Sequence, residues 1–147
     1  MTQVDFYHLT RIPLERVLPQ IAEKVLATGG RLLVVEADEA RRAALDRLLW
    51  TYAPASFLPH GLAGESGAAD QPVLLAGDVD AANGARAIAL VDGRWRDDAL
   101  DFDRALHFFD EAAIRDARAA WKALAARDGL TRRYWKQNET GRWEQAA

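Results

Sequence analysis

The residues with the clearest chemical potential lie in one short segment, Phe57-Leu-Pro-His-Gly-Leu-Ala-Gly-Glu-Ser66. It brings His60, Glu65 and Ser66 close in sequence, and these residue types can act as general base, orienting carboxylate and nucleophile. The segment lacks the G-x-S-x-G signature, however, and a catalytic triad needs rigid elements that orient its members. A small hydrolase or transferase that uses these three residues is one hypothesis. A surface that binds another protein is the alternative.

Other patterns of catalytic or metal-binding residues are missing from the sequence. The chain has no cysteine, so it offers neither a disulfide nor a thiolate. Its three histidines, His8, His60 and His107, do not have the spacing of a metal-binding motif. The turn at residues 10–13 contains no glycine, although a phosphate-binding turn after a first strand needs one. We therefore expect no metal site, no nucleotide-binding motif and no cofactor.

The composition is that of an ordinary globular protein. The 147 residues are 50% hydrophobic and 28% charged, with a net charge of −3, and we expect a single domain over residues 1–147. No apolar run approaches the ~20 residues of a membrane span. The first residues lack the basic and apolar regions of a secretory signal. The sequence thus predicts a cytoplasmic protein without a membrane partner.

Hydrophobic periodicity predicts strands that alternate with helices. The expected strands are 4–9, 31–36, 72–76, 85–91 and 104–109. The expected helices run from Pro13 to Gly29, from an Asp38 cap to about Trp50, and from an Asp110 cap to about Asp128. Residues 53–72 hold three prolines and three glycines and are expected to be irregular. This order predicts a three-layer α/β domain with a mainly parallel sheet. The basic, aromatic tail at about 130–147 has no assigned structure.

Basic side chains concentrate in the last helix and the tail. Between residues 114 and 142 there are eight basic and three acidic side chains. Helical spacing places four apolar residues on one face: Ile114, Ala117, Trp121 and Leu124. The same spacing places three cations on the adjoining face: Arg115, Arg118 and Lys122. This pattern suits either a core helix with a solvated edge or a site for a peptide with one apolar side chain and negative charge.

The tryptophans allow a further hypothesis. Trp121, Trp135 and Trp143 lie among these basic residues and could serve as stacking platforms for single-stranded nucleic acid. At the other candidate surface, Trp50 and Tyr52 precede Phe57 and Leu58 among prolines. These aromatic residues either seal the edge of the sheet or anchor a protein interface.

Several segments together indicate a family. They are Val4-Asp-Phe-Tyr-His-Leu9, Leu45-Asp-Arg-Leu-Leu-Trp50, Ser56-Phe-Leu-Pro-His-Gly-Leu-Ala-Gly-Glu65, Gln71-Pro-Val73 and Ala117-Arg-Ala-Ala-Trp-Lys122. In these segments the chain resembles the chi subunits of bacterial DNA polymerase III holoenzyme, which are small accessory proteins of the clamp loader. The resemblance covers nearly the whole chain in order, and the segment that ends at Glu65 is its most specific part.

The resemblance implies a Rossmann-like α/β domain without nucleotide-binding motif or catalytic residues. It implies a non-catalytic subunit of DNA replication with two partners. One is the psi subunit, which links chi to the clamp loader. The other is single-stranded DNA-binding protein, whose acidic C-terminal tail ends in Pro-Phe. Contact with DNA would then be mainly indirect.

Matching positions assign residues to each partner. Trp50, Phe57, Pro59 and His60 match the psi-binding surface, where the resemblance also allows a helicase partner. Four residues match the tail-binding site: Arg115, Arg118, Trp121 and Lys122. Two positions depart from the family pattern there, since Ile114 stands where a basic residue is expected and Trp121 replaces a tyrosine. We expect Arg115 to substitute for the missing cation, and Trp135 or Lys136 to join the pocket.

Overall fold

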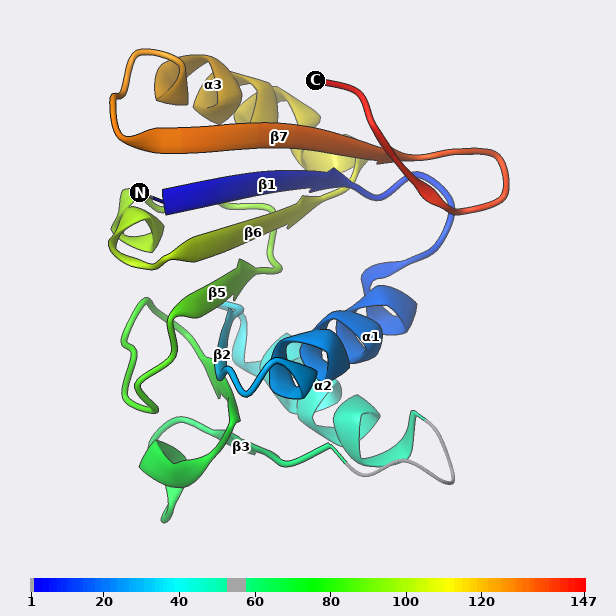
Figure 1. The fold of residues 1–147 in the computed structure, drawn as a ribbon. Coiled ribbons are helices and arrows are strands. Elements are labelled where there is room, and N and C mark those ends of the chain that lie inside the picture. Colours follow the sequence, from blue (N-terminus) through cyan, green and yellow to red (C-terminus); the bar gives the residue numbers. More distant parts are fainter. Residues whose placement is uncertain (1, 53–57) are drawn as a thin grey trace.

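The computed structural model describes residues 2–52 and 58–147, in which one sheet carries helices on both of its faces (Figure 1). The strands are β1 (Thr2–His8), β2 (Leu32–Val35), β3 (His60–Leu62), β4 (Val73–Ala76), β5 (Ala87–Leu90), β6 (Arg104–Phe109), β7 (Leu130–Gln137) and β8 (Trp143–Gln145). The α-helices are α1 (Leu14–Ala27), α2 (Glu39–Thr51) and α3 (Ile114–Leu124). Short 3-10 helices are η1 (Ala68–Asp70), η2 (Asp97–Asp101) and η3 (Glu111–Ala113).

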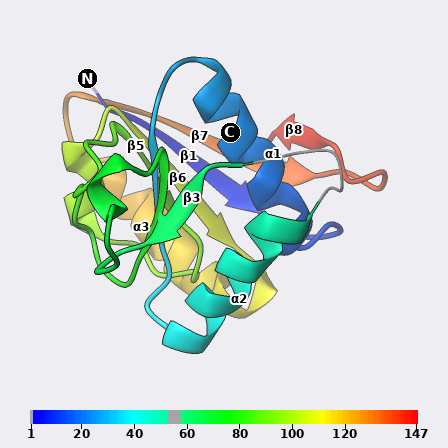
Figure 2. The same cartoon turned by 90° about the horizontal axis from the view of Figure 1, so that it is seen from below.

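The sheet has eight strands in the order β3-β4-β2-β5-β6-β1-β7-β8. All neighbouring pairs are parallel except β7 and β8. Helices α1 and α2 lie on one face and α3 lies on the other, as the view from below makes plain (Figure 2). The predicted Rossmann-like three-layer α/β fold with a mainly parallel sheet is therefore confirmed.

Alternate side chains of each central strand supply two separate cores. In β2, Leu33 and Val35 pack toward α3, whereas Leu32 and Val34 pack toward α1 and α2. All four side chains are fully buried. A strand covered on both faces reads as a continuous apolar run, which is why β2 was recognisable in the sequence.

The last helix is shorter than predicted. Asp110 does cap the segment, because its side chain accepts a hydrogen bond from Ala112 N at 3.0 Å, but the first turn is the 3-10 helix η3. At the other end α3 stops at Leu124 instead of Asp128. From Ala125 to Arg127 each backbone N–H bonds to the carbonyl three residues earlier. This tighter winding ends the α-helix before Gly129, whose φ of 80° turns the chain into β7.

Two segments left without strands by the sequence analysis join the sheet. The supposedly irregular stretch contains β3, an edge strand of three residues that pairs with β4. The unassigned tail forms β7, which pairs with β1, and β8, which folds back on β7. Both segments escaped recognition because backbone pairing at the sheet margin does not require the apolar runs of the central strands. No helix in the described part of the chain has the length and apolar character needed to cross a bilayer.

His107 is a polar residue at the centre of the core. It is fully buried in β6, with the rings of Phe6, Trp95 and Phe109 at 5.1, 5.6 and 5.5 Å. Neither ring nitrogen has a hydrogen-bond partner among the described residues. Burial lowers the pKa of His107 from 6.5 to about 4. The imidazole is therefore neutral in the folded protein at neutral pH.

We predict that His107→Leu leaves the protein at least as stable at pH 7 and makes it more stable than the wild type at pH 5. Between pH 6.5 and about 4 the unfolded chain binds a proton that the folded chain does not, so the wild type loses stability as the pH falls. At pH 5 this loss is on the order of 2 kcal/mol. Urea unfolding of both proteins across this range measures it. A parallel pH dependence in the two proteins would contradict the prediction.

Candidate functional site

Helix α3 presents the apolar and basic faces that its sequence predicts. Ala117 and Leu124 are buried, and Ile114 and Trp121 are partly buried against the same core. The three cations on the adjoining face are all exposed: Arg115, Arg118 and Lys122. The structure thus brings the four residues expected to bind the tail onto one exposed helix, with Trp121 at the border between its core-facing and solvent-facing sides.

Trp121 is held in a fixed orientation by residues from two strands. Its ring meets Phe6 of β1 at 5.4 Å and Tyr134 of β7 at 5.5 Å, both edge to face. The guanidinium of Arg132 lies 4.0 Å above the ring, and its Nη1 donates a hydrogen bond to the Trp121 carbonyl at 2.6 Å. Such a cation over an indole face adds attraction to the packing.

The sequence analysis did not assign Arg132 and Tyr134 to this site. Within β7 they point to the α3 side, because side chains alternate along a strand. Trp135, by contrast, packs with Tyr7 on the face that carries α1 and α2. The expectation that Trp135 joins the Trp121 pocket is therefore wrong. Lys136 aligns with His8 in the β1–β7 register and is exposed.

Positive charge gathers where β1 and β7 end beside the first turns of α3. His8 Nε2 lies 2.9 Å from Glu111 Oε1. Burial lowers the pKa of His8, Glu111 opposes this shift, and Lys136 and Arg118 add to it. Burial also raises the pKa of Tyr134, against the effect of Arg118. Arg118 is thus close enough to both rings to influence them, and its charge lies near the Trp121 pocket.

The second surface is formed by Trp50, Pro59 and His60. Trp50 is 55% exposed at the end of α2, and its ring lies 4.6 Å from the ring of His60. All three residues line a small cavity of about 270 Å³, together with Glu65 and Ser66. Phe57, the fourth residue assigned to this surface, lies outside the described residues.

His60 has a structural role in this arrangement. The side chain is fully buried; Nδ1 lies 2.7 Å from the Leu58 carbonyl oxygen and Nε2 lies 3.0 Å from that of Asp46. The Asp46 carboxylate is 3.2 Å from Nε2. Both nitrogens therefore face acceptors of the protein itself, so neither is directed to Ser66, which is exposed in a turn. His60, Glu65 and Ser66 therefore line one cavity, but the contacts of His60 with Leu58 and Asp46 do not leave its imidazole directed to Ser66 as a base.

Metal chemistry gains no support from the geometry either. Within residues 2–52 and 58–147, no group of three or more histidine and acidic side chains is arranged to hold a metal ion. The candidate sites are thus two surfaces with partly exposed aromatic rings, one bordered by cations and one supported by a buried histidine.

Comparison with known proteins identifies relatives of the same kind. The DNA polymerase III subunit chi of Pseudomonas aeruginosa is 41% identical over 78 residues, which are 51% of this chain and 54% of that protein. The DNA polymerase III subunit chi of Escherichia coli K12 is 29% identical over 126 residues, which are 83% of this chain and 86% of that protein. The match thus spans about half of the first relative and most of the second.

A family model extends the match over most of the sequence. The model described as DNA polymerase III chi subunit, HolC, matches residues 1–131. This range includes α3 and the surface around Trp50, and it ends inside β7, before Arg132 and Tyr134. The chain belongs to the family of DNA polymerase III chi subunits, the accessory subunits of that replicative polymerase.

Proposed function

We propose that this chain is a non-catalytic bridge in the cytoplasmic DNA replication machinery. One surface binds the psi subunit, which joins the clamp loader, and the other binds the C-terminal tail of single-stranded DNA-binding protein. The observation that carries the proposal is the partly exposed Trp121 beside the exposed Arg118 on α3.

The tail-binding site is proposed on α3. The terminal phenylalanine of the tail packs against Trp121 and Ile114, which are both only partly buried. Arg118 pairs with the terminal carboxylate, because a guanidinium can bind both carboxylate oxygens. Arg115 and Lys122, on the same exposed face, meet the acidic residues that precede it. The position of Arg118 supports its role in this site, since its charge opposes the rise that burial causes in the pKa of Tyr134, whose ring contacts Trp121.

The psi-binding site is proposed around Trp50. Exposed tryptophans are frequent anchors of protein interfaces, and Trp50 is more than half exposed. Pro59 adds apolar surface next to it, and Phe57 belongs to the same sequence motif. His60 is buried and its ring contacts that of Trp50 at 4.6 Å, so it acts as a positioning residue.

The proposed mechanism is tethering. A DNA strand coated with many copies of the binding protein displays many identical tails. A weak and salt-sensitive contact with each tail then keeps the polymerase machinery near its template, because a released tail is replaced by a neighbour at high effective concentration.

We predict that an acidic peptide ending in Pro-Phe binds with a dissociation constant of about micromolar magnitude, and that Arg118→Ala weakens it at least about tenfold. The loss arises from the carboxylate partner that Arg118 provides. Arg16→Ala, an exposed arginine of α1, is the matched control and should bind as the wild type does. Calorimetric titration at two salt concentrations measures both effects. If a peptide that lacks the final phenylalanine bound as tightly as the complete peptide, the assigned site would be wrong.

We predict that Trp50→Ala abolishes co-purification with psi while the free energy of unfolding changes by less than about 1 kcal/mol. His60→Ala should lower that free energy by about 1–3 kcal/mol, because the hydrogen bond that the buried imidazole donates to the carbonyl of Leu58 or Asp46 is lost. Arg47→Ala, exposed on the same helix, is the control for binding. Retention of psi by a folded Trp50→Ala protein would remove Trp50 from the proposed surface.

A further inference from the structure

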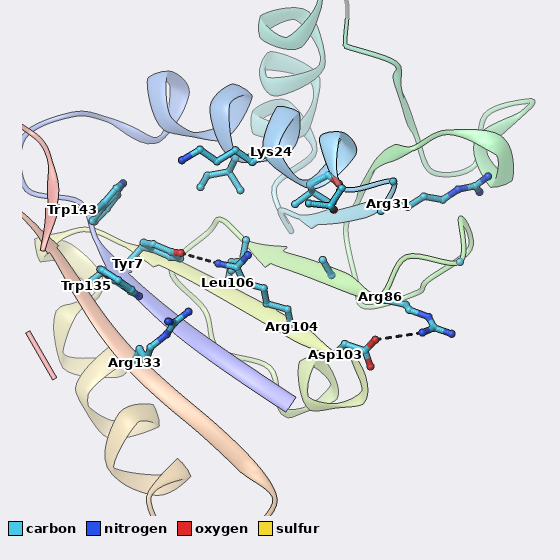
Figure 3. A pocket seen from close by; sticks show the side chains of 17 residues that line it. Tyr7, Lys24, Arg31, Arg86, Asp103, Arg104, Leu106, Arg133, Trp135 and Trp143 are labelled. Carbon is cyan, nitrogen blue, oxygen red and sulfur yellow. Dashed lines mark hydrogen bonds and ion pairs between the residues drawn. The ribbon is translucent and has the colours of Figure 1, made fainter. Parts of the chain in front are cut away.

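A groove unrelated to either surface lies on the α1 side of the sheet. It encloses about 840 Å³ between the C-terminal half of α1 and strands β1, β6 and β7 (Figure 3). Its aromatic rings are those of Tyr7, Trp135 and Trp143, which gather at one end. Trp121 and Arg118 belong to the opposite face of the sheet, so this groove and the α3 surface do not overlap.

The groove is lined by five cations, although the chain as a whole carries a net charge of −3. They come from α1, the loops at the N-terminal ends of strands, and two strands: Lys24, Arg31, Arg86, Arg104 and Arg133. Lys24 is exposed and forms no ion pair with any residue that the structure describes. The Arg86 side chain is 88% exposed, 3.7 Å from Asp103. One acidic residue, Asp103, also lines the groove, so the cations are in excess and the charge of the groove is opposite in sign to that of the protein.

A buried carboxylate holds two of these arginines in place. Asp5 of β1 is fully buried, with Arg133 Nε at 2.8 Å, Trp135 Nε1 at 3.0 Å and Arg104 Nε at 3.3 Å. Burial alone would raise the pKa of Asp5, but the hydrogen bonds from Arg133, Trp135 and Gln3 outweigh it and lower the pKa. The Arg104 and Arg133 side chains remain 43% and 33% exposed. One anion thus fixes two guanidinium groups whose outer sides face the groove.

The aromatic rings are also fixed. Tyr7 stacks on Phe108 at 4.9 Å, Trp135 lies parallel to Tyr7 at 6.4 Å, and Trp143 of β8 meets Tyr7 edge to face at 5.0 Å. Trp135 and Trp143 are each partly exposed. The hairpin formed by β7 and β8 therefore brings two tryptophans to the end of a cation-lined groove.

We propose that this groove binds single-stranded nucleic acid directly. Sequence-independent sites for single strands combine cations that follow the phosphates with aromatic side chains that stack on bases. Here the bases contact Trp135 and Trp143, and the phosphates lie along the cations that line the groove, which include Lys24 and Arg86. The volume is sufficient for a short stretch of nucleotides. An acidic peptide would use the cations but has no need of several rings in one place, so the observations favour nucleic acid.

The test measures fluorescence anisotropy of a labelled oligothymidylate of about ten nucleotides at about 50 mM salt. We predict binding that weakens steeply as salt is raised. The double variant Lys24→Glu, Arg86→Glu should bind at least about tenfold more weakly. Both side chains are exposed, so the fold is retained, and circular dichroism confirms it. Arg16→Glu, on the same helix but outside the groove, should match the wild type.

A second variant tests the aromatic part of the groove. Trp143→Ala should reduce affinity about tenfold through lost stacking. A saturating amount of the acidic Pro-Phe peptide should leave oligonucleotide binding unchanged, because the two sites lie on opposite faces of the sheet. The proposal is overturned by a wild-type protein that does not bind the oligonucleotide, by groove variants that bind it normally, or by competition from the peptide. Loss of peptide binding in the Lys24→Glu, Arg86→Glu protein would instead assign the groove to an acidic peptide.

Discussion

The buried carboxylate of Asp5 is the interaction on which the second half of the sheet depends. It lies on β1 between β6 and β7, aligned with Arg133 and diagonal to Arg104. A charge with no exposure is tolerated only when partners compensate for its lost hydration, and here the neighbouring strands provide them. The same bonds determine where two arginines and Trp135 point. The orientation of these three side chains, and with it the shape of the proposed groove, therefore depends on one anion.

Strand β1 also separates the two kinds of surface. Tyr7 lines the groove and Asp5 holds two of its arginines, whereas Phe6, between them in sequence, supports Trp121 on the opposite face. Because side chains alternate along a strand, one short segment serves two sites that do not share a residue. A substitution of Phe6 is thus expected to act on the α3 surface, and one of Tyr7 on the groove.

Much of this fold can be predicted from the sequence, and the elements that could not be predicted have physical reasons. Strands such as β2 are apolar throughout because helices cover both faces, and Asp38 caps α2 by accepting from Arg41 N at 2.9 Å, as its position predicts. Strand β7 is half polar, because the groove separates Arg133 and Trp135 from α1 and leaves them partly exposed, so its run of charges resembled a tail. The family motif indicated Arg118 and Trp121. It could not indicate the Asp5–Arg133 pair, whose members lie 128 residues apart.

The central position of β1 has a consequence for biosynthesis. Its partners are β6, which begins at Arg104, and β7, which begins at Leu130. While the polypeptide leaves the ribosome, α1, β2, α2 and β4 are available to one another long before β1 has anything to pair with. Strand β1 can therefore join the sheet only after β6 has been made, and its pairing with β7 follows later still. Such non-local pairing slows folding, and until β6 and β7 have been made the apolar side of β1 has neither of its neighbouring strands.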